Sequence, residues 1–174
     1  MMDKLKKLLD LIATGAFIVL CCVAIFWFVE NRIERAPRQA SGIAVGDAMP
    51  EVLPIEYEAH DRTLILVLSA DCRFCVESTP FYKSLVESLQ DTSELREEVQ
   101  VVAVVTEDED TSDSFISSAG LQEIPLFSGV KLRNLRVRGT PTLLLVDRQG
   151  IVVNLWRGKL VRGAEQEVLK ALTG

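Results

Sequence analysis

Three continuous apolar runs constrain the fold of this chain more than any other feature of its sequence. They are TLILVLS at residues 63–69, VQVVAVV at 99–105 and TLLLVD at 142–147. Each is rich in Val, Ile and Leu and lacks the apolar-polar alternation of a half-exposed strand, which is typical of strands buried on both faces of a sheet. The runs therefore predict an α/β fold in which helices cover both faces of a central sheet.

Two segments between these runs have the pattern of helices. Phe81, Leu85 and Leu89 recur at helical spacing, so we expect a helix over about residues 74–90. After the second run, an acidic loop with N-cap candidates leads into a short helix that should end at Gly120. The order strand, helix, strand, helix, strand follows.

The flanking segments complete the predicted domain. The turn RQG joins the third strand to a fourth at residues 151–156, and RGAEQEVLKALTG at 162–174 makes a closing helix. EVLPIEYEA at 51–59 contains Pro54 and therefore suits an edge strand or a small hairpin better than a central strand. The prediction is one mixed sheet flanked by helices.

A different apolar segment lies near the N-terminus, where residues 11–29 include no charged side chain. As a helix with a rise of about 1.5 Å per residue it would be roughly 28 Å long, close to the ~30 Å hydrocarbon core of a bilayer. We expect an uncleaved transmembrane signal anchor, with a cleaved signal peptide as the alternative. The predicted organisation is a membrane anchor with its juxtamembrane segment at residues 1–39 and one globular domain at 40–174.

Basic residues flank the predicted span on both sides, so their bias barely decides its orientation. A short N-terminus followed by a large domain favours placing the domain outside. We therefore expect a single-pass protein of the inner or cytoplasmic membrane with an extracytoplasmic domain.

The charge of the globular domain excludes one class of partner. Beyond residue 39 the chain carries 13 basic and 21 acidic side chains, a net charge of −8. Nucleic-acid binding requires a basic surface that neutralises phosphates. We expect no nucleic-acid partner.

The four cysteines divide into two pairs. Cys21 and Cys22 lie inside the predicted span, while Cys72 and Cys75 form the motif CRFC after the first apolar run. A structural zinc site needs four ligands, and the only histidine is His60, so we expect no metal and no cofactor. A disulfide closing so short a loop would stabilise the fold little. A redox-active pair remains.

The position of the pair at a helix start suggests a role for each cysteine. Cys72 would lie at the helix N-terminus, where unpaired N–H groups and the helix dipole favour a thiolate. Cys75, one turn further on, could then resolve a mixed disulfide by intramolecular attack. Arg73 would add a positive charge beside the nucleophile. We predict Cys72 as the nucleophile and Cys75 as the resolving thiol.

With these motifs the sequence resembles the thioredoxin-fold thiol-disulfide oxidoreductases, more narrowly their membrane-anchored TlpA-like and redoxin-type branch. The resemblance covers about residues 45–172 and rests on VGDAMPE, on the first run with CRFC, and on VRGTPTLLLVDRQGIVV. It implies a cis Pro141 opposite the cysteines and a Thr140 that offers backbone groups to an extended substrate segment. It also implies that the partners are protein thiols and disulfides and a redox partner protein.

The chain departs from the usual pattern of that family beside the cysteines. Ala70 and Asp71 stand where the family has an aromatic and a small residue, and the strand carries no buried carboxylate. Glu77 or Glu107 are then candidates for handling protons. We also hypothesise that Arg73 and Arg138 form a positive rim that stabilises the Cys72 thiolate and favours acidic partners.

Two alternatives remain open. A peroxiredoxin-like thiol peroxidase would need a proline four residues before Ser69, where the chain has Ile65. A non-catalytic thioredoxin-fold interaction or assembly factor would keep its activity without either cysteine.

Overall fold

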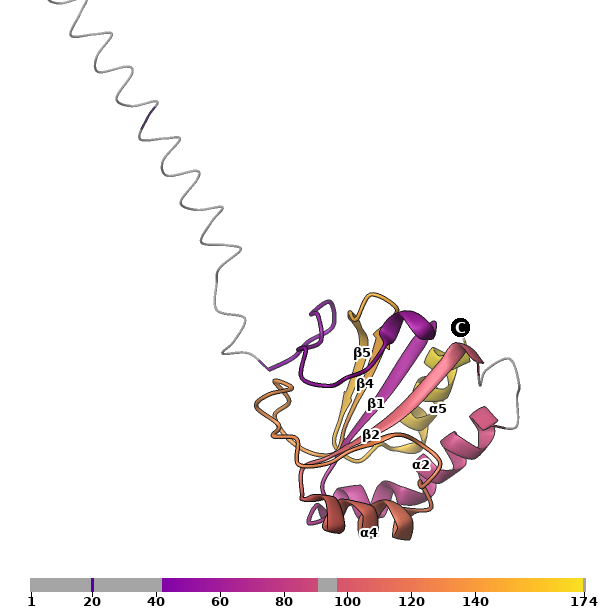
Figure 1. Cartoon of the computed structure of the whole chain (residues 1–174). Helices are drawn as coiled ribbons and strands as arrows, with labels where there is room; N and C mark the ends of the chain where they lie inside the picture. The colour runs from indigo at the N-terminus through magenta and orange to yellow at the C-terminus, as the bar shows by residue number, and fades with distance from the viewer. Residues whose placement is uncertain (1–19, 21–41, 91–96, 174) are drawn as a thin grey trace, which may run out of the picture. The chain divides into compact units, whose positions relative to one another are not determined.

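The computed structural model describes residues 20, 42–90 and 97–173. Residues 42–174 form one unit built on a five-stranded sheet in the order β3-β2-β1-β4-β5 (Figure 1). β1 pairs in parallel with β2 and antiparallel with β4, which confirms the predicted mixed sheet. The strands are β1 (Arg62–Leu68), β2 (Val99–Val105), β3 (Leu126–Phe127), β4 (Thr142–Asp147) and β5 (Val152–Arg157).

The helices are 3-10 helix η1 (Tyr57–Ala59), α2 (Arg73–Gln90), α4 (Glu109–Ala119) and α5 (Arg162–Thr173). The start of α4 is capped by the side chain of Asp108, which accepts a hydrogen bond from the Thr111 N–H. Its end lies where the sequence predicts it, because Gly120 adopts the left-handed conformation, φ 69°, that closes a helix.

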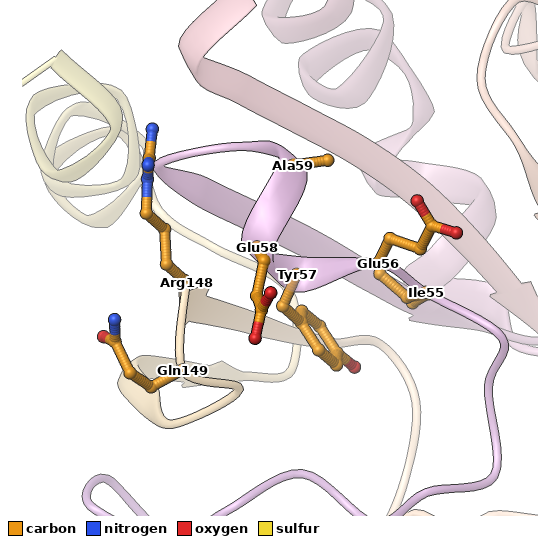
Figure 2. Close-up of a pocket in the computed structure, with 7 residues that line it drawn as sticks. All are labelled: Ile55, Glu56, Tyr57, Glu58, Ala59, Arg148 and Gln149. Carbon is orange, nitrogen blue, oxygen red and sulfur yellow. The ribbon is translucent and has the colours of Figure 1, made fainter.

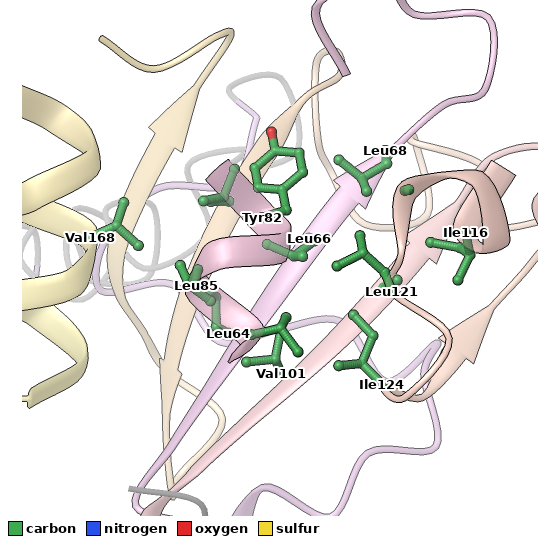
Figure 3. Packing of buried hydrophobic residues seen from close by; sticks show 14 of the residues in the cluster. Leu64, Leu66, Leu68, Tyr82, Leu85, Val101, Ile116, Leu121, Ile124 and Val168 are labelled. Atoms are coloured by element: carbon green, nitrogen blue, oxygen red, sulfur yellow. The ribbon is translucent and has the colours of Figure 1, made fainter. Parts of the chain in front are cut away.

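One face of the sheet packs against α2, α4 and α5. Leu64, Leu66 and Leu68 of β1 point to this face and are fully buried. Figure 3 shows them surrounded by side chains from the helices and the neighbouring strand. The helical contributions to this cluster include Tyr82, Leu85 and Leu89 of α2, Phe115 and Ile116 of α4, and Val168 and Leu172 of α5.

The opposite face has a different cover, and the prediction of helices on both faces is wrong. Ile65 and Val67 of β1 face a second cluster to which, in the part of the chain described, α2, α4 and α5 contribute no residue. Right-handed crossovers from β1 to β2 and from β2 to β3 move the same way across the sheet, which places α2 and α4 on one side. Irregular segments cover the other side with Ile43, Met49, Leu53, Leu135 and Val137.

Two smaller predictions also change. Residues 51–59 form turns and η1 rather than an edge strand or a hairpin, because after Pro54 the chain is held by local bonds such as that from the Ala59 N–H to the Glu56 carbonyl. The two-residue strand β3 was not expected, since so short a strand has no hydrophobic periodicity.

The predicted membrane span at residues 11–29 lies outside the described residues apart from Leu20. Among the residues that are described, no helix is both long and apolar enough to cross a bilayer. The anchor therefore stays a prediction.

Candidate functional site

The two cysteines lie where the chain passes from β1 into α2. Cys72 directly precedes the helix, and its carbonyl accepts hydrogen bonds from the N–H groups of Cys75 (2.9 Å) and Val76 (3.2 Å). Both sulfurs are thiols in this structure; Cys72 is partly exposed and Cys75 is fully buried. Only the predicted nucleophile is therefore open to a partner.

The loop before β4 meets the cysteines from the other side. The Thr140–Pro141 peptide bond is cis, as the sequence predicts. The thiol of Cys72 donates a hydrogen bond to the Thr140 carbonyl at 3.3 Å, across 68 residues of sequence. The loop is held in turn by a hydrogen bond from the Gly158 N–H to the Pro141 carbonyl at 2.8 Å. The structure thus brings together the predicted cysteines and the predicted substrate-binding residues, whose substrate role stays a prediction.

The environments of the two thiols shift their pKa values in opposite directions. For Cys72, partial desolvation would raise the pKa, but hydrogen bonds with the Thr140 side chain, with Cys75 and with the Phe74 N–H together hold it below its usual range. For Cys75, burial raises the pKa to about 12, and the hydrogen bond with Cys72 adds to the rise. The arrangement favours a thiolate at Cys72 and a neutral thiol at Cys75.

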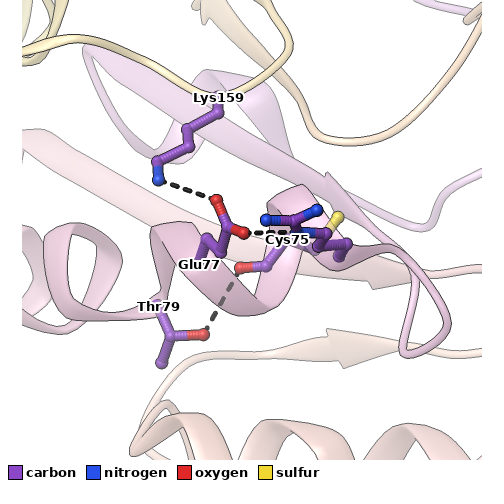
Figure 4. Close-up of polar contacts among 5 residues, drawn as sticks. Cys75, Glu77, Thr79 and Lys159 are labelled. Atoms are coloured by element: carbon purple, nitrogen blue, oxygen red, sulfur yellow. Dashed lines mark hydrogen bonds and ion pairs between the residues drawn. The ribbon is translucent and has the colours of Figure 1, made fainter.

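The arginine beside the nucleophile is paired with an acid. The Arg73 side chain, 85% exposed, makes an ion pair with Glu77 at 2.6 Å, and Lys159 contacts the other Glu77 oxygen at 2.8 Å. Figure 4 shows the Lys159 contact together with the bond from the Thr79 hydroxyl to the Cys75 carbonyl. The hydrogen bonds from Lys159 and Arg73 lower the pKa of Glu77. Glu77 is therefore a poor proton acceptor, and part of the Arg73 charge is neutralised locally.

Arg138, the second arginine of the predicted rim, lies in the segment between β3 and β4. Its side chain packs against Gly42, where an added Cβ would come within 3.0 Å of the Arg138 Cγ. The proposed modulation of Cys72 by Arg73 and Arg138 stays a prediction, because the hydrogen bonds that lower the Cys72 pKa come from other groups.

Sequence reasoning missed one polar contact beside the pair. Ser69, the first residue after β1, donates a hydrogen bond from its hydroxyl to the Glu107 carboxylate at 2.6 Å. The sequence names both residues but separates them by 38 positions. The parallel pairing of β1 with β2 could have indicated the contact, since each residue follows the carboxyl end of its strand.

A pocket of about 560 Å³ lies at the other end of the sheet (Figure 2). It is lined by η1 with its flanking residues and by Arg148 and Gln149 of the β4–β5 turn. These segments adjoin the start of β1, whereas the cysteines follow its end, so the pocket is no part of the cysteine site. Nor do three or more His, Cys, Asp or Glu side chains gather into a possible metal site anywhere among the described residues.

Comparison with known proteins places this geometry in a family. Solved structures with similar folds include a candidate thiol:disulfide interchange protein DsbE from Chlorobium tepidum, at 22% identity and a TM-score of 0.57, covering 75% of this chain and 99% of that one. StoA from Bacillus subtilis matches at 16% identity and a TM-score of 0.54, covering 77% and 99%. The thioredoxin domain of a thiol-disulfide oxidoreductase from Bacteroides vulgatus matches at 16% identity and 0.56, covering 76% and 99%.

No curated protein sequence matches the chain. The family model described as the thioredoxin-like domain matches residues 54–172, a range that includes both cysteines and Pro141. The chain therefore belongs to the thioredoxin-like domain family.

Proposed function

We propose that this protein is a membrane-anchored thiol-disulfide oxidoreductase that exchanges disulfides with extracytoplasmic protein partners through Cys72 and Cys75. The observation that carries the proposal is the inequality of the two thiols. Cys72 is partly exposed with a lowered pKa, while Cys75 is buried with a pKa raised to about 12. Disulfide exchange requires an exposed thiolate for attack and a second, protected thiol for resolution.

The exchange with a partner disulfide balances in two steps. The Cys72 thiolate attacks one partner sulfur, a Cys72–partner disulfide forms, and the other partner sulfur leaves as a thiolate. Cys75 then loses its proton and attacks the Cys72 sulfur, which releases the second partner thiolate and forms the Cys72–Cys75 disulfide. The protein dithiol is oxidised by two electrons and the partner disulfide is reduced; the reverse sequence oxidises a partner dithiol.

Thr140 supports recognition of an extended partner segment. Its carbonyl lies 3.3 Å from the Cys72 sulfur, so a strand-like segment that reaches this sulfur would pass the backbone of the loop. The similar structures described as thiol-disulfide oxidoreductases or interchange proteins support the same class of reaction.

The experiment uses the full chain in detergent, with Cys21 and Cys22 replaced by serine so that only two thiols remain. Cys75→Ser should accumulate a mixed disulfide with a disulfide-bonded protein substrate. The parent protein should reduce that substrate without accumulating the mixed disulfide. Cys72→Ser should do neither. Disulfide reduction that survives Cys72→Ser would contradict the proposed nucleophile. A parent protein that does not reduce the substrate would favour a non-catalytic interaction role, and peroxide consumption faster than disulfide reduction would favour the thiol peroxidase.

Membrane anchoring is proposed from the sequence of residues 11–29 and is tested separately. The full chain expressed in cells should remain with membranes after carbonate washing. External protease should remove the domain from spheroplasts or from sealed vesicles whose extracytoplasmic side faces outward. Release of the intact domain by carbonate, or full protection of the domain, would contradict the anchor or its orientation respectively.

A further inference from the structure

Ser69 contacts both cysteines through its main chain. Its carbonyl accepts a hydrogen bond from the Cys72 N–H at 3.2 Å. Its own N–H forms a hydrogen bond with the Cys75 sulfur, which favours the Cys75 thiolate against the larger effect of burial. A displacement of Ser69, which joins these two successive peptide units, would therefore disturb both members of the pair.

The side chain of Ser69 is fixed by a residue from the neighbouring strand. Its hydroxyl donates to Glu107 Oε1 at 2.6 Å, a short bond of the kind that a charged acceptor makes. The Glu107 carboxylate also accepts a hydrogen bond from the Ala70 N–H. One carboxylate thus holds two successive residues of the loop that leads to Cys72.

Glu107 is itself anchored. Its carbonyl accepts hydrogen bonds from the Gly129 N–H at 2.6 Å and from the Ser112 hydroxyl of α4 at 3.1 Å. Its second carboxylate oxygen is buried and makes no hydrogen bond with any part of the chain that the structure describes. Withdrawing a charged group from water costs free energy unless the group is paired or hydrogen-bonded. The hydrogen bond from Ser69 is one of the contacts that offset this cost.

We propose that Ser69 and Glu107 are positioning residues for the cysteine pair: the carboxylate holds the side chain, and with it the main chain, of Ser69 so that Cys75 can attack the Cys72 sulfur. This inference rests on the proposed disulfide exchange. It assigns the two residues to the second step of that exchange, in which the Cys72–partner disulfide breaks and the Cys72–Cys75 disulfide forms.

Glu107 could act in two ways, and removing its carboxylate would change the rate of resolution in opposite directions in the two cases. If its negative charge acted directly on Cys75, removing the charge would favour the Cys75 thiolate and speed resolution. If Glu107 acts by holding Ser69, removing the hydrogen bond would slow resolution. Glu107 as the proton acceptor is disfavoured, because the hydrogen bonds with Ser69 and Ala70 outweigh its desolvation and lower its pKa, far from that of a thiol near 12.

The test uses Ellman's disulfide with the full chain, again with Cys21 and Cys22 replaced by serine. Attack by Cys72 releases one thionitrobenzoate and leaves a mixed disulfide; attack by Cys75 releases the second and forms the intramolecular disulfide. The two phases are followed by rapid mixing from pH 6 to pH 10. The equilibrium constant of each variant against glutathione gives its reduction potential.

We expect Ser69→Ala and Glu107→Ala each to slow the second phase by about threefold to tenfold, the range of one lost hydrogen bond, and to change the first phase by less than about twofold. Glu107→Gln keeps an oxygen that can accept from Ser69, and Ser69→Thr keeps the hydroxyl, so both should stay within about twofold of the parent. The double variant Ser69→Ala/Glu107→Ala should be no slower than the slower single variant.

Matched controls separate positioning from general destabilisation. Glu109→Gln removes an exposed acid from the first turn of α4, and Ser114→Ala removes a hydroxyl bonded within the same helix. Both should leave the two phases unchanged. The inference is overturned by a normal second phase in Ser69→Ala, by additive effects in the double variant, or by a Glu107→Gln variant that resolves as slowly as Glu107→Ala. Absence of a second phase in the parent would instead contradict the proposed function.

Discussion

The two ends of β1 differ in what gathers around them. At the carboxyl end, main-chain and side-chain groups of Ser69, Thr140 and the cysteines converge on two sulfur atoms, with a hydrogen bond as short as 2.6 Å behind them. At the amino end lies a pocket of about 560 Å³ that is lined by η1 with its flanking residues and by the β4–β5 turn (Figure 2). The polar contacts thus converge on the cysteines and not on the larger hollow, and we expect thiol reactivity to differ between the two ends accordingly.

The largest expected effect is a difference in reactivity between the two thiols at the carboxyl end. At pH 7 a thiol of pKa about 12 is roughly 10⁻⁵ ionised, whereas one below 9 is more than about 10⁻² ionised. The weaker nucleophilicity of the lower-pKa thiolate offsets part of this difference, and burial of Cys75 adds to it. We expect the reduced protein to be alkylated at Cys72 at least about a hundredfold faster.

The measurement is the initial rate of iodoacetamide labelling, resolved by peptide. Arg73 lies between the cysteines, so trypsin separates them into different peptides. Tyr57→Phe at the amino end is the matched control and should leave the Cys72 rate unchanged. Comparable rates for the two cysteines, or a Cys72 rate that depends on Tyr57, would break the distinction between the ends.

The three apolar runs predicted the sheet well, because a strand buried on both faces needs apolar residues at nearly every position. β2 and β4 have the predicted bounds and β1 is shifted by one residue, since each strand is apolar throughout and few other structures tolerate that. The cysteine pair was expected because a two-residue spacing at a strand-to-helix turn is itself a local signal. The Thr140–Pro141 loop was expected only through the resemblance to the thioredoxin-fold family.

What the sequence could not predict depends on contacts between distant residues. The second face of the sheet is covered by turns around Leu135 and by the segment near Met49, whose apolar residues have no regular spacing. The bond between Ser69 and Glu107 joins two loops that meet only once β1 and β2 are paired. The partner of Arg73 was missed because either Glu77 or the nearby thiolate could have attracted it.

A second prediction concerns the strand that joins the two ends. Leu66 lies in the middle of β1 and is fully buried against the helices. Leu66→Ala should lower the free energy of unfolding by about 2–5 kcal/mol, because it removes apolar contacts and leaves a cavity. Denaturant unfolding of the reduced protein measures this.

The control for Leu66→Ala is Val45→Ala, which removes methyl groups from a side chain that is 61% exposed and should cost less than about 0.5 kcal/mol. Below the unfolding transition, the pH dependence of Cys72 labelling should be the same in both variants. A shifted Cys72 profile in Leu66→Ala would mean that the core tunes the site as well as supporting it.

A third prediction compares the two ends of β1 by how they make the free energy of unfolding depend on pH. Burial raises the pKa of Cys75 from 9.0 to about 12, and that of Tyr57 in the pocket from 10.0 to about 12. Each group therefore ionises at a lower pH in the unfolded chain than in the folded protein. Its contribution to stability is fully present below the pKa of the unfolded chain and is lost as the pH rises towards the pKa of the folded protein. Replacing Cys75 by alanine should flatten the fall in stability above pH 9, and Tyr57→Phe should flatten it above pH 10.

The loss of stability due to Cys75 should be larger than that due to Tyr57, because the pKa values of the unfolded and folded states differ more for Cys75. The measurement is the free energy of unfolding from pH 8 to pH 11, compared with the reduced parent protein. Oxidising Cys72 and Cys75 to the disulfide should remove the Cys75 contribution and leave that of Tyr57. An unchanged pH dependence in the Cys75 variant would contradict the buried, neutral thiol on which the division of roles depends.

The smallest effect is expected at the amino end, where Arg148 pairs with Asp61 beside the pocket. Both side chains are about half exposed, so water and salt screen their attraction. Asp61→Asn should change the free energy of unfolding by less than about 1 kcal/mol, and the change should vanish in 1 M salt. Ellman's assay should show both phases unaltered. A tenfold change in either phase would show that the ends communicate through β1, because Asp61 precedes that strand and Ser69 follows it. The hydrogen bond between Ser69 and Glu107 would then be only one part of what sets the reactivity of the cysteines.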